Sequence, residues 1–422
     1  MADQSTNYQC PACTGPLHFV GASGKLECDY CGSSYSVEEI EKLYEEKNET
    51  AAANAGKDEG WGEGSDGMKT YSCPSCGAEM ITDSNTAATC CPYCGNQTVM
   101  PGQFDGALKP ELVIPFKNDK KAAIEALKNH YKGKFLLPKS FVSGNHIDDI
   151  QGVYVPFWLF DGKADGSMRF DARKVHTETR GNTEITTTEY YQVDRSGSLE
   201  FEKIPVDASS RMPDAHMDSI EPYDYSELKP FSMAYMPGFL ADRYDVEVQD
   251  CRGRMEERSK QSLEQALDNT VNGYTSKSTI NKDLNVEVDK AHYAMMPVWL
   301  LATKWKDQNF LFAMNGQTGK LIGDLPMDKG KFFGLFAGIS VVLIALFTLI
   351  AGGSFDGGTY AIVCIGIPII ISLIVCLIMR SQLLSVHTGN ADQYVAGGGL
   401  DLRYKNDLYL RTERETREIK RE

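Results

Sequence analysis

The sequence lacks the basic excess that favours broad contact with nucleic acid or anionic lipid headgroups, because its 422 residues carry a formal net charge of −15. We also expect no signal peptide, since residues 1–9 are polar and contain neither a basic stretch nor an apolar core. The chain is too long for one ordinary domain. We therefore expect several domains and an N-terminal region in the cytosol.

Catalytic motifs are missing as well. The sequence contains no HExxH and no GxSxG, and residues 316–321 lack the interval and the Ser or Thr of a phosphate-binding loop. The seven histidines are scattered and suggest no ligand set. Cys251 lies near Arg252 and Arg254, which could lower the pKa of its thiol, although an ordinary cysteine is the more common case. We predict that the protein is not an enzyme and has no organic cofactor site.

Eight of the twelve cysteines form two quartets of identical spacing. Each quartet consists of two CxxC pairs with fourteen residues between them, a spacing that lets two knuckles fold around one tetrahedral Zn²⁺. Disulfides or a redox CxxC are the alternative, but a reducing cytosol suits thiolate zinc sites. Cys90 is the spare cysteine, because only Cys91 keeps the spacing. We predict two structural zinc sites, with the ligands Cys10, Cys13, Cys28 and Cys31 in the first and Cys73, Cys76, Cys91 and Cys94 in the second.

Two apolar runs without charge cover residues 332–351 and 360–379. Each is about 30 Å long as a helix, which matches the hydrocarbon core of a bilayer. The alternative is a pair of buried helices in a soluble core. Lys329 and Lys331 precede the first run and Arg380 follows the second, so the positive-inside rule places both termini in the cytosol. We predict a multi-pass protein of the cell membrane.

The rest of the sequence pattern indicates a multidomain protein. We predict two small β zinc ribbons, an α+β cytosolic domain with a duplicated helix–strand unit, and a two-helix transmembrane hairpin. The expected bounds are 1–47 for zinc ribbon 1, 48–68 for a flexible acidic linker, 69–104 for zinc ribbon 2, 105–328 for the cytosolic domain, 329–380 for the hairpin and 381–422 for a cytosolic tail. The charged residues 403–422 predict either a helix at the membrane surface or a disordered tail.

The duplicated unit is indicated by a repeated order of elements. Helical spacing at 118–131 and 257–271 precedes two strand candidates that share the pattern Pro-x-Trp-Leu, at 156–159 and 297–300. Further strand candidates cover 168–175, 183–193 and 310–314. The prolines predict edge strands or bulges, and the tryptophans predict core packing in preference to ligand binding.

Four strings carry a resemblance to a known family: VIPF at 113–116, GVYVPFW at 152–158, KIPVDAS at 203–209 and FAMNGQTGK at 312–320. With the two ribbons and the first apolar run, they resemble bacterial TFIIB-type zinc-ribbon membrane proteins. This resemblance implies a membrane-anchored scaffold or receptor that recruits a phage-shock protein A homologue in membrane stress. It also implies an SPFH-domain protein and a second membrane protein as partners.

The alternative function is a nucleic-acid-binding zinc-ribbon protein tethered to the membrane. Residues 1–100 contain fifteen acidic and five basic side chains, whereas phosphate binding needs a basic surface. We therefore expect the ribbons to contact proteins rather than nucleic acid.

Overall fold

The computed structural model describes residues 8–52, 68–72, 79–83, 86–90, 97–99, 109–144, 147–306, 308–351, 357–387 and 389–418. The second cysteine quartet lies outside these residues, and so does Trp61, a tryptophan of the predicted linker. Helix α1 continues to Ala52, into the segment 48–68 that the sequence predicts as a linker. The remainder of that segment up to residue 67 lies outside the described residues.

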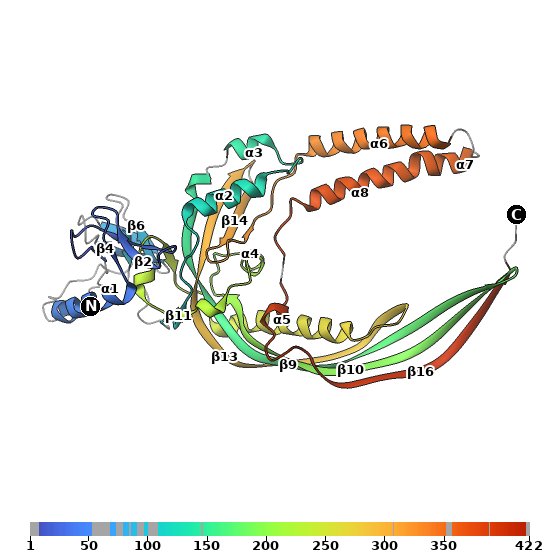
Figure 1. Ribbon diagram of the computed structural model, residues 1–422, viewed down its shortest axis with the longest axis horizontal. Coiled ribbons are helices and arrows are strands. Elements are labelled where there is room, and N and C mark those ends of the chain that lie inside the picture. The colour runs from blue at the N-terminus through green and yellow to red at the C-terminus, as the bar shows by residue number, and fades with distance from the viewer. Residues whose placement is uncertain are drawn as a thin grey trace.

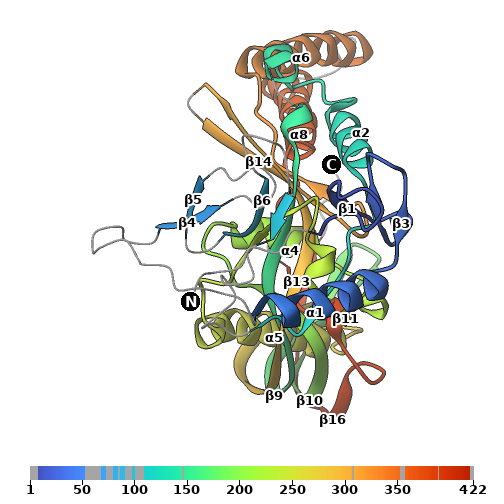
Figure 2. The same cartoon turned by 90° about the vertical axis from the view of Figure 1, so that its left-hand side faces the viewer.

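A small antiparallel sheet begins the described chain. It contains β1 (Leu17–Val20), β2 (Lys25–Cys28) and β3 (Ser34–Tyr35), and α1 (Val37–Ala52) follows it. The helix starts with a capping box, because the Ser36 amide donates to Glu39 and the Glu39 amide donates to Ser36 Oγ. We call residues 8–36 ribbon 1. Ribbon 1 and α1 lie at one end of the molecule, which Figure 2 shows from the front.

The described residues also form an eleven-stranded sheet that contains most of the core. Strand order along its main path is β11-β8-β13-β9-β12-β6-β7, while β10 pairs with β9 and β16, and β14 pairs with β13 and β15. A separate two-stranded sheet consists of β4 (Met68–Ser72) and β5 (Glu79–Asp83). The bounds in the large sheet are β6 (Thr86–Cys90), β7 (Gln97–Val99), β8 (Leu112–Val113), β9 (Gln151–Arg180), β10 (Thr183–Asp207), β11 (Lys229–Pro230), β12 (Leu240–Asp242), β13 (Ser276–Trp305), β14 (Gln308–Asn315), β15 (Leu321–Ile322) and β16 (Asp401–Glu418).

The helices connect and cover this sheet. The α-helices after α1 are α2 (Lys120–Tyr131), α3 (Lys139–Gly144), α4 (Asp214–Ser219), α5 (Val248–Asn269), α6 (Lys329–Ala351), α7 (Gly357–Tyr360) and α8 (Ile367–Ser381). Short 3₁₀ turns are η2 (Ile147–Asp149), η3 (Tyr225–Glu227), η4 (Met233–Tyr235) and η6 (Asp392–Tyr394), and η5 (Ala361–Gly366) is a π-helix. The predicted helices at 118–131 and 257–271 correspond to α2 and α5, although α5 begins earlier, at Val248.

We call the eleven-stranded sheet, together with helices α2 to α5, the body. The body repeats one order of elements, β8-α2-β9-β10 and then β12-α5-β13-β14. β9 and β13 run antiparallel as neighbours, while β8 lies parallel to β13 and β12 lies parallel to β9. Each half therefore contributes its first short strand to the long strand of the other half. Trp158 donates from Nε1 to Val246 O just before α5, and Trp299 donates to Asn118 O just before α2. Both buried tryptophans thus fix the start of the helix in the opposite half.

The prediction that the two prolines mark edge strands or bulges is wrong. Pro156 lies in β9 and Pro297 in β13, the two central strands. On its far side, β9 pairs with β12 up to Tyr154 and with β10 from Phe157, so Pro156 falls between the two neighbours. Pro297 likewise falls between the partners β8 and β14. A proline is tolerated at each point because no neighbouring strand needs its missing N–H.

The outer parts of β9, β10, β13 and β16 form a long, curved extension of the sheet, which we call the arm (Figure 1). Helix α5 covers its inner half. The arm bends at Asp161 and Gly162, where both neighbouring strands bulge, β10 between Phe201 and Ile204 and β13 between Val288 and Lys290. A Cβ on Gly162 would lie 2.6 Å from the Glu287 carbonyl oxygen, so the bend requires glycine there.

The C-terminal segment forms strand β16, so both predicted states of residues 403–422, a membrane-surface helix and a disordered tail, are wrong for the described part of it. β16 pairs with β10 along its whole length. Cross-strand polar contacts support this pairing, because Arg195 Nη1 lies 2.5 Å from Asp407 Oδ1 and Tyr190 Oη donates to Glu413. The charges therefore serve strand pairing rather than a helix surface.

Two apolar helices leave the body together and form a hairpin (Figure 1). The segments Lys329–Ala351 and Gly357–Ser381 are long and apolar enough to cross a membrane, and only 6% of the most apolar window of the first is buried. The π-helix η5 ends at Gly366, two residues before Pro368, so the helix has a wider turn just before this proline. A Cβ on Gly334 or Gly338 would meet no atom within 4 Å, so these glycines do not mediate helix packing in the hairpin.

Candidate metal centre

Two tight turns bring the first cysteine quartet together. After the first CxxC, Thr14 adopts φ 60° and its amide donates to Cys10 O, while the Cys10 amide donates to Gly15 O. After the second, Gly32 adopts φ 72° and its amide donates to Cys28 O. The left-handed residue reverses the chain so that both cysteines of each pair face the same point. The sequence signal was the CxxC spacing, and each turn follows from it.

The four thiols form a cluster suited to a metal ion. The Sγ atoms of Cys10, Cys13, Cys28 and Cys31 all lie within 4.8 Å of one another. The Cys10–Cys31 and Cys13–Cys28 sulfur distances are 3.5 and 3.4 Å. A tetrahedral Zn²⁺ with four sulfur ligands requires sulfur separations of about 3.8 Å, so the cluster needs little adjustment to hold such an ion. Four protein ligands would leave no open coordination position, and this arrangement serves structure rather than catalysis.

The thiols differ in acidity because they exchange hydrogen bonds. Hydrogen bonding with Ser33, whose Oγ lies 3.3 Å from Cys31 Sγ, lowers the pKa of Cys31 to about 6. The Gly15 amide lowers the pKa of Cys13, but hydrogen bonds with the thiols of Cys31 and Cys28 outweigh it and raise that pKa to about 12. The cluster therefore shares protons among its sulfurs. A bound cation displaces these protons, so its affinity must fall as the pH falls.

Ribbon 1 packs against the body. The Phe19 amide donates to Pro237 O at 2.9 Å, and the Phe19 ring contacts the Tyr235 ring at a centroid distance of 5.2 Å. A Cβ on Gly21 would lie 2.0 Å from the Phe116 carbonyl oxygen, so the two backbones approach as closely as glycine allows. The cluster is therefore held at a fixed place on the body.

The second quartet, with Cys73, Cys76, Cys91 and Cys94, lies outside the described residues. The flanking strands are described: β6 ends at Cys90 and pairs with β7. β6 also pairs with β12, so this part of the chain adds a strand to the main sheet. The predicted ribbon 2 thus shares main-chain hydrogen bonding with the large sheet.

Cys251 is not activated as a nucleophile. Its side chain is buried on α5, and burial raises the pKa of its thiol to about 12. Arg254 opposes this rise, but its guanidinium donates to Asp207 and Asp218, at 2.8 and 2.9 Å. Arg254 does act to lower this pKa, but burial and the charge of Asp207 outweigh it, so the pKa of Cys251 agrees with the ordinary cysteine that the sequence favours.

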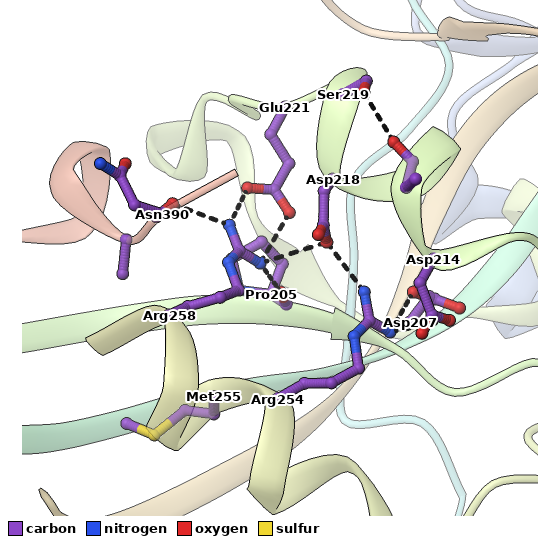
Figure 3. A network of polar contacts seen from close by, with 12 residues as sticks. Pro205, Asp207, Asp214, Asp218, Ser219, Glu221, Arg254, Met255, Arg258 and Asn390 are labelled. Atoms are coloured by element: carbon purple, nitrogen blue, oxygen red, sulfur yellow. Dashed lines mark hydrogen bonds and ion pairs between the residues drawn. The ribbon is translucent and has the colours of Figure 1, made fainter. Parts of the chain in front are cut away.

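Sequence reasoning missed a buried ionic network centred on Arg258 of α5 (Figure 3). Arg258 binds Glu221 through two hydrogen bonds of 2.6 and 3.1 Å, and Tyr394 Oη donates to the same carboxylate at 2.8 Å. Arg258 also donates to the carbonyl oxygens of Pro205 and Asn390. Because Asn390 and Tyr394 follow the hairpin in sequence, this network holds the chain after the hairpin against the body.

Burial sets the acidity of this network. It raises the pKa of Glu221 to about 7, although Arg258 and Tyr394 oppose the rise. Burial also raises the pKa of Asp207 to about 6, against the effect of Arg254. The i, i+4 spacing of Arg254 and Arg258 on one face of α5 was the available sequence signal.

Comparison with known proteins shows the family to which the chain belongs. No protein-family model matches it, and no solved structure matches it. The "uncharacterized protein YdjG" of Bacillus subtilis (strain 168) is 34% identical over 352 residues, an alignment that covers 83% of this chain and 99% of the relative. The chain belongs to the YdjG family. A YdjG alignment of this length extends well beyond the two ribbons, so the similarity includes the sheet body.

Proposed function

We propose that this chain is a non-catalytic, membrane-anchored zinc-ribbon scaffold that recruits a phage-shock protein A homologue and an SPFH-domain protein during membrane stress. The observation that supports it best is the hairpin, whose two helices expose most of their apolar side chains, as in Phe333, Leu349 and Ile350. A bilayer is the environment that would cover such a surface. Ribbon 1 lies at the opposite end of the body from the hairpin (Figure 1), and a partner that contacts it would not have to contact the bilayer.

The ribbons are proposed as structural zinc modules of the TFIIB type. Four cysteine thiols are soft ligands that favour Zn²⁺ in a tetrahedral site. The second quartet has the same spacing as the first, so we assign it a second Zn²⁺. The repeated strand and helix order of the body supports a duplicated helix–strand unit as its origin.

The proposed topology is multi-pass with both termini in the cytosol. A reporter inserted at Gly357 should behave as extracytoplasmic, and a reporter fused after Glu422 should behave as cytosolic. The charge pattern supports this direction, because Lys329, Lys331 and Arg380 flank the apolar segments. Alkaline phosphatase and green fluorescent protein fusions would measure the two positions. An extracytoplasmic C-terminal fusion would mean that one helix alone crosses.

The recruitment proposal predicts recovery of the named partners from gently solubilised membranes. Truncation of residues 1–104 is a poor test, because it removes the packing of ribbon 1 and the strand β6. A sharper variant is Cys13→Ser with Cys31→Ser, since these two thiols are exposed while Cys10 and Cys28 are buried. Cys90→Ser, outside both quartets, is the matched control.

Affinity capture followed by mass spectrometry gives the readout. The intact chain and the Cys90→Ser control should both recover a phage-shock protein A homologue under membrane stress. Loss of the partner in the double variant would place its docking surface on ribbon 1, and retention would place it elsewhere on the cytosolic face. Recovery of neither partner with the intact chain would overturn the recruitment proposal.

A further inference from the structure

A groove lies where the hairpin meets the body. Its volume is about 810 Å³, and the loop after α2, helix α3 and the first turn of α6 line it. We call it the basal groove. Phe135 and Val142 present apolar surface in it, with exposed fractions of 55% and 39%. Apolar side chains that gather beside a hollow mark a candidate interaction surface.

Three lysines line the same groove, Lys134, Lys139 and Lys331. Within the part of the chain that the structure describes, none of the three forms an ion pair with a carboxylate. Lys331 Nζ instead donates to Leu137 O at 2.6 Å, and Lys134 Nζ donates to Gln382 O at 2.5 Å. The basal groove is thus a local excess of positive charge on a chain whose net charge is −15.

The position of the groove relative to the hairpin is fixed by these hydrogen bonds. Lys331 lies on the first turn of α6, directly before Phe332 and Phe333, where the apolar run begins. Lys134 binds the backbone just after α8 ends. The groove therefore lies at the depth where the hydrocarbon of a bilayer would end and the phosphates of its lipids would begin.

We propose that the basal groove binds the headgroup of an anionic phospholipid. The three lysines surround its phosphate, while Phe135 and Val142 contact the start of an acyl chain. This proposal rests on the membrane insertion of the hairpin proposed above. A lipid fits better than a soluble phosphate because the groove combines cationic and apolar walls and opens beside a membrane span.

The test compares lipid binding by the full chain and by a triple variant, Lys134→Gln, Lys139→Gln and Lys331→Gln. The purified protein in detergent is mixed with equal amounts of phosphatidylglycerol and phosphatidylcholine, and native mass spectrometry counts the lipids retained. The wild-type chain should retain phosphatidylglycerol preferentially. Each lysine removed should weaken this preference by roughly fivefold, the factor that corresponds to about 1 kcal/mol per charge near an anionic lipid. Phe135→Ser should lower the number of phosphatidylglycerol molecules retained without removing the preference for this lipid over phosphatidylcholine.

The matched control is Lys25→Gln with Lys290→Gln and Lys405→Gln, which removes the same charge from exposed positions away from the groove. Unchanged phosphatidylglycerol preference in the groove variant, or equal loss in the control, would overturn the proposal. Displacement of the bound phosphatidylglycerol by soluble glycerol 3-phosphate at equal concentration would overturn the assignment of the ligand as a lipid. Flotation of each variant with phosphatidylcholine vesicles separates the two proposals, because a chain that fails to float has lost membrane insertion rather than the headgroup site.

Discussion

Replacing Cys28 with serine should remove one equivalent of zinc from the full chain and unfold ribbon 1. Cys28 is buried, and its sulfur lies 3.4 Å from Cys13 Sγ, so a shorter, weaker hydroxyl ligand would leave the cluster incomplete. Structural zinc sites contribute about 10–16 kcal/mol of apparent binding free energy at neutral pH. We expect no other single substitution in this protein to cost as much free energy of folding. Elemental analysis of the metal-to-protein ratio provides the measurement.

Cys90→Ser is the control and should retain both metals, whereas Cys91→Ser should lose one. A wild-type chain with one zinc would refute the second site, and a chain with iron would refute the metal assignment. Acidification gives an independent check. Protons compete with the metal for the thiolates, so zinc should dissociate from the wild-type chain as the pH falls. Zinc should bind again when the pH is raised.

Replacing Arg258 with methionine should destabilise the body by about 3–5 kcal/mol at pH 8. The substitution leaves the carboxylate of Glu221 buried and without its cationic partner, 2.6 Å away in the native protein. Arg252→Met is the matched control, because Arg252 lies on the same helix but pairs with Glu256 at the surface. Such an exposed pair contributes about 0.5 kcal/mol or less. Denaturant unfolding in detergent, followed by tryptophan fluorescence, measures both variants.

The pH dependence of this effect has a definite sign. Burial raises the pKa of Glu221 to about 7 in the folded chain, from a usual value of 4.5. Between these two values the folded state binds more protons, so the contribution of Glu221 to wild-type stability falls by about 3 kcal/mol as the pH rises. The raised pKa values of Asp207 and Asp218 act in the same direction.

Arg258→Met should therefore cost more stability at pH 8 than at pH 5, where Glu221 is protonated. The double variant Glu221→Gln with Arg258→Met should be more stable at pH 8 than Arg258→Met alone, because the amide carries no charge. Equal losses for Arg258→Met and Arg252→Met, or a loss that does not change with pH, would contradict this account.

Sequence reasoning succeeded where structure depends on near neighbours. The first cysteine cluster follows from CxxC spacing, α2 and α5 follow from helical periodicity, and the hairpin helices follow from two uncharged runs. It failed where distant segments decide the outcome. Strand β16 depends on pairing with β10, and its charges gave no sign of that partner. Pro156 sits in a central strand because β12 ends and β10 begins beside it, which no local pattern predicts.

The bend at Asp161 and Gly162 decides where the arm can go if the hairpin enters a bilayer. In Figure 1 the arm and the hairpin leave the body in the same direction. Residues 163–180 extend about 60 Å as a strand, twice the thickness of the hydrocarbon core, and residues 173–180 are exposed and largely polar or charged. Lipid cannot accommodate such a strand alongside two apolar helices. If the hairpin inserts, the arm must therefore lie at a different angle to the hairpin than in this structure, and the bulges opposite Asp161 and Gly162 mark the irregular point of the sheet closest to the body.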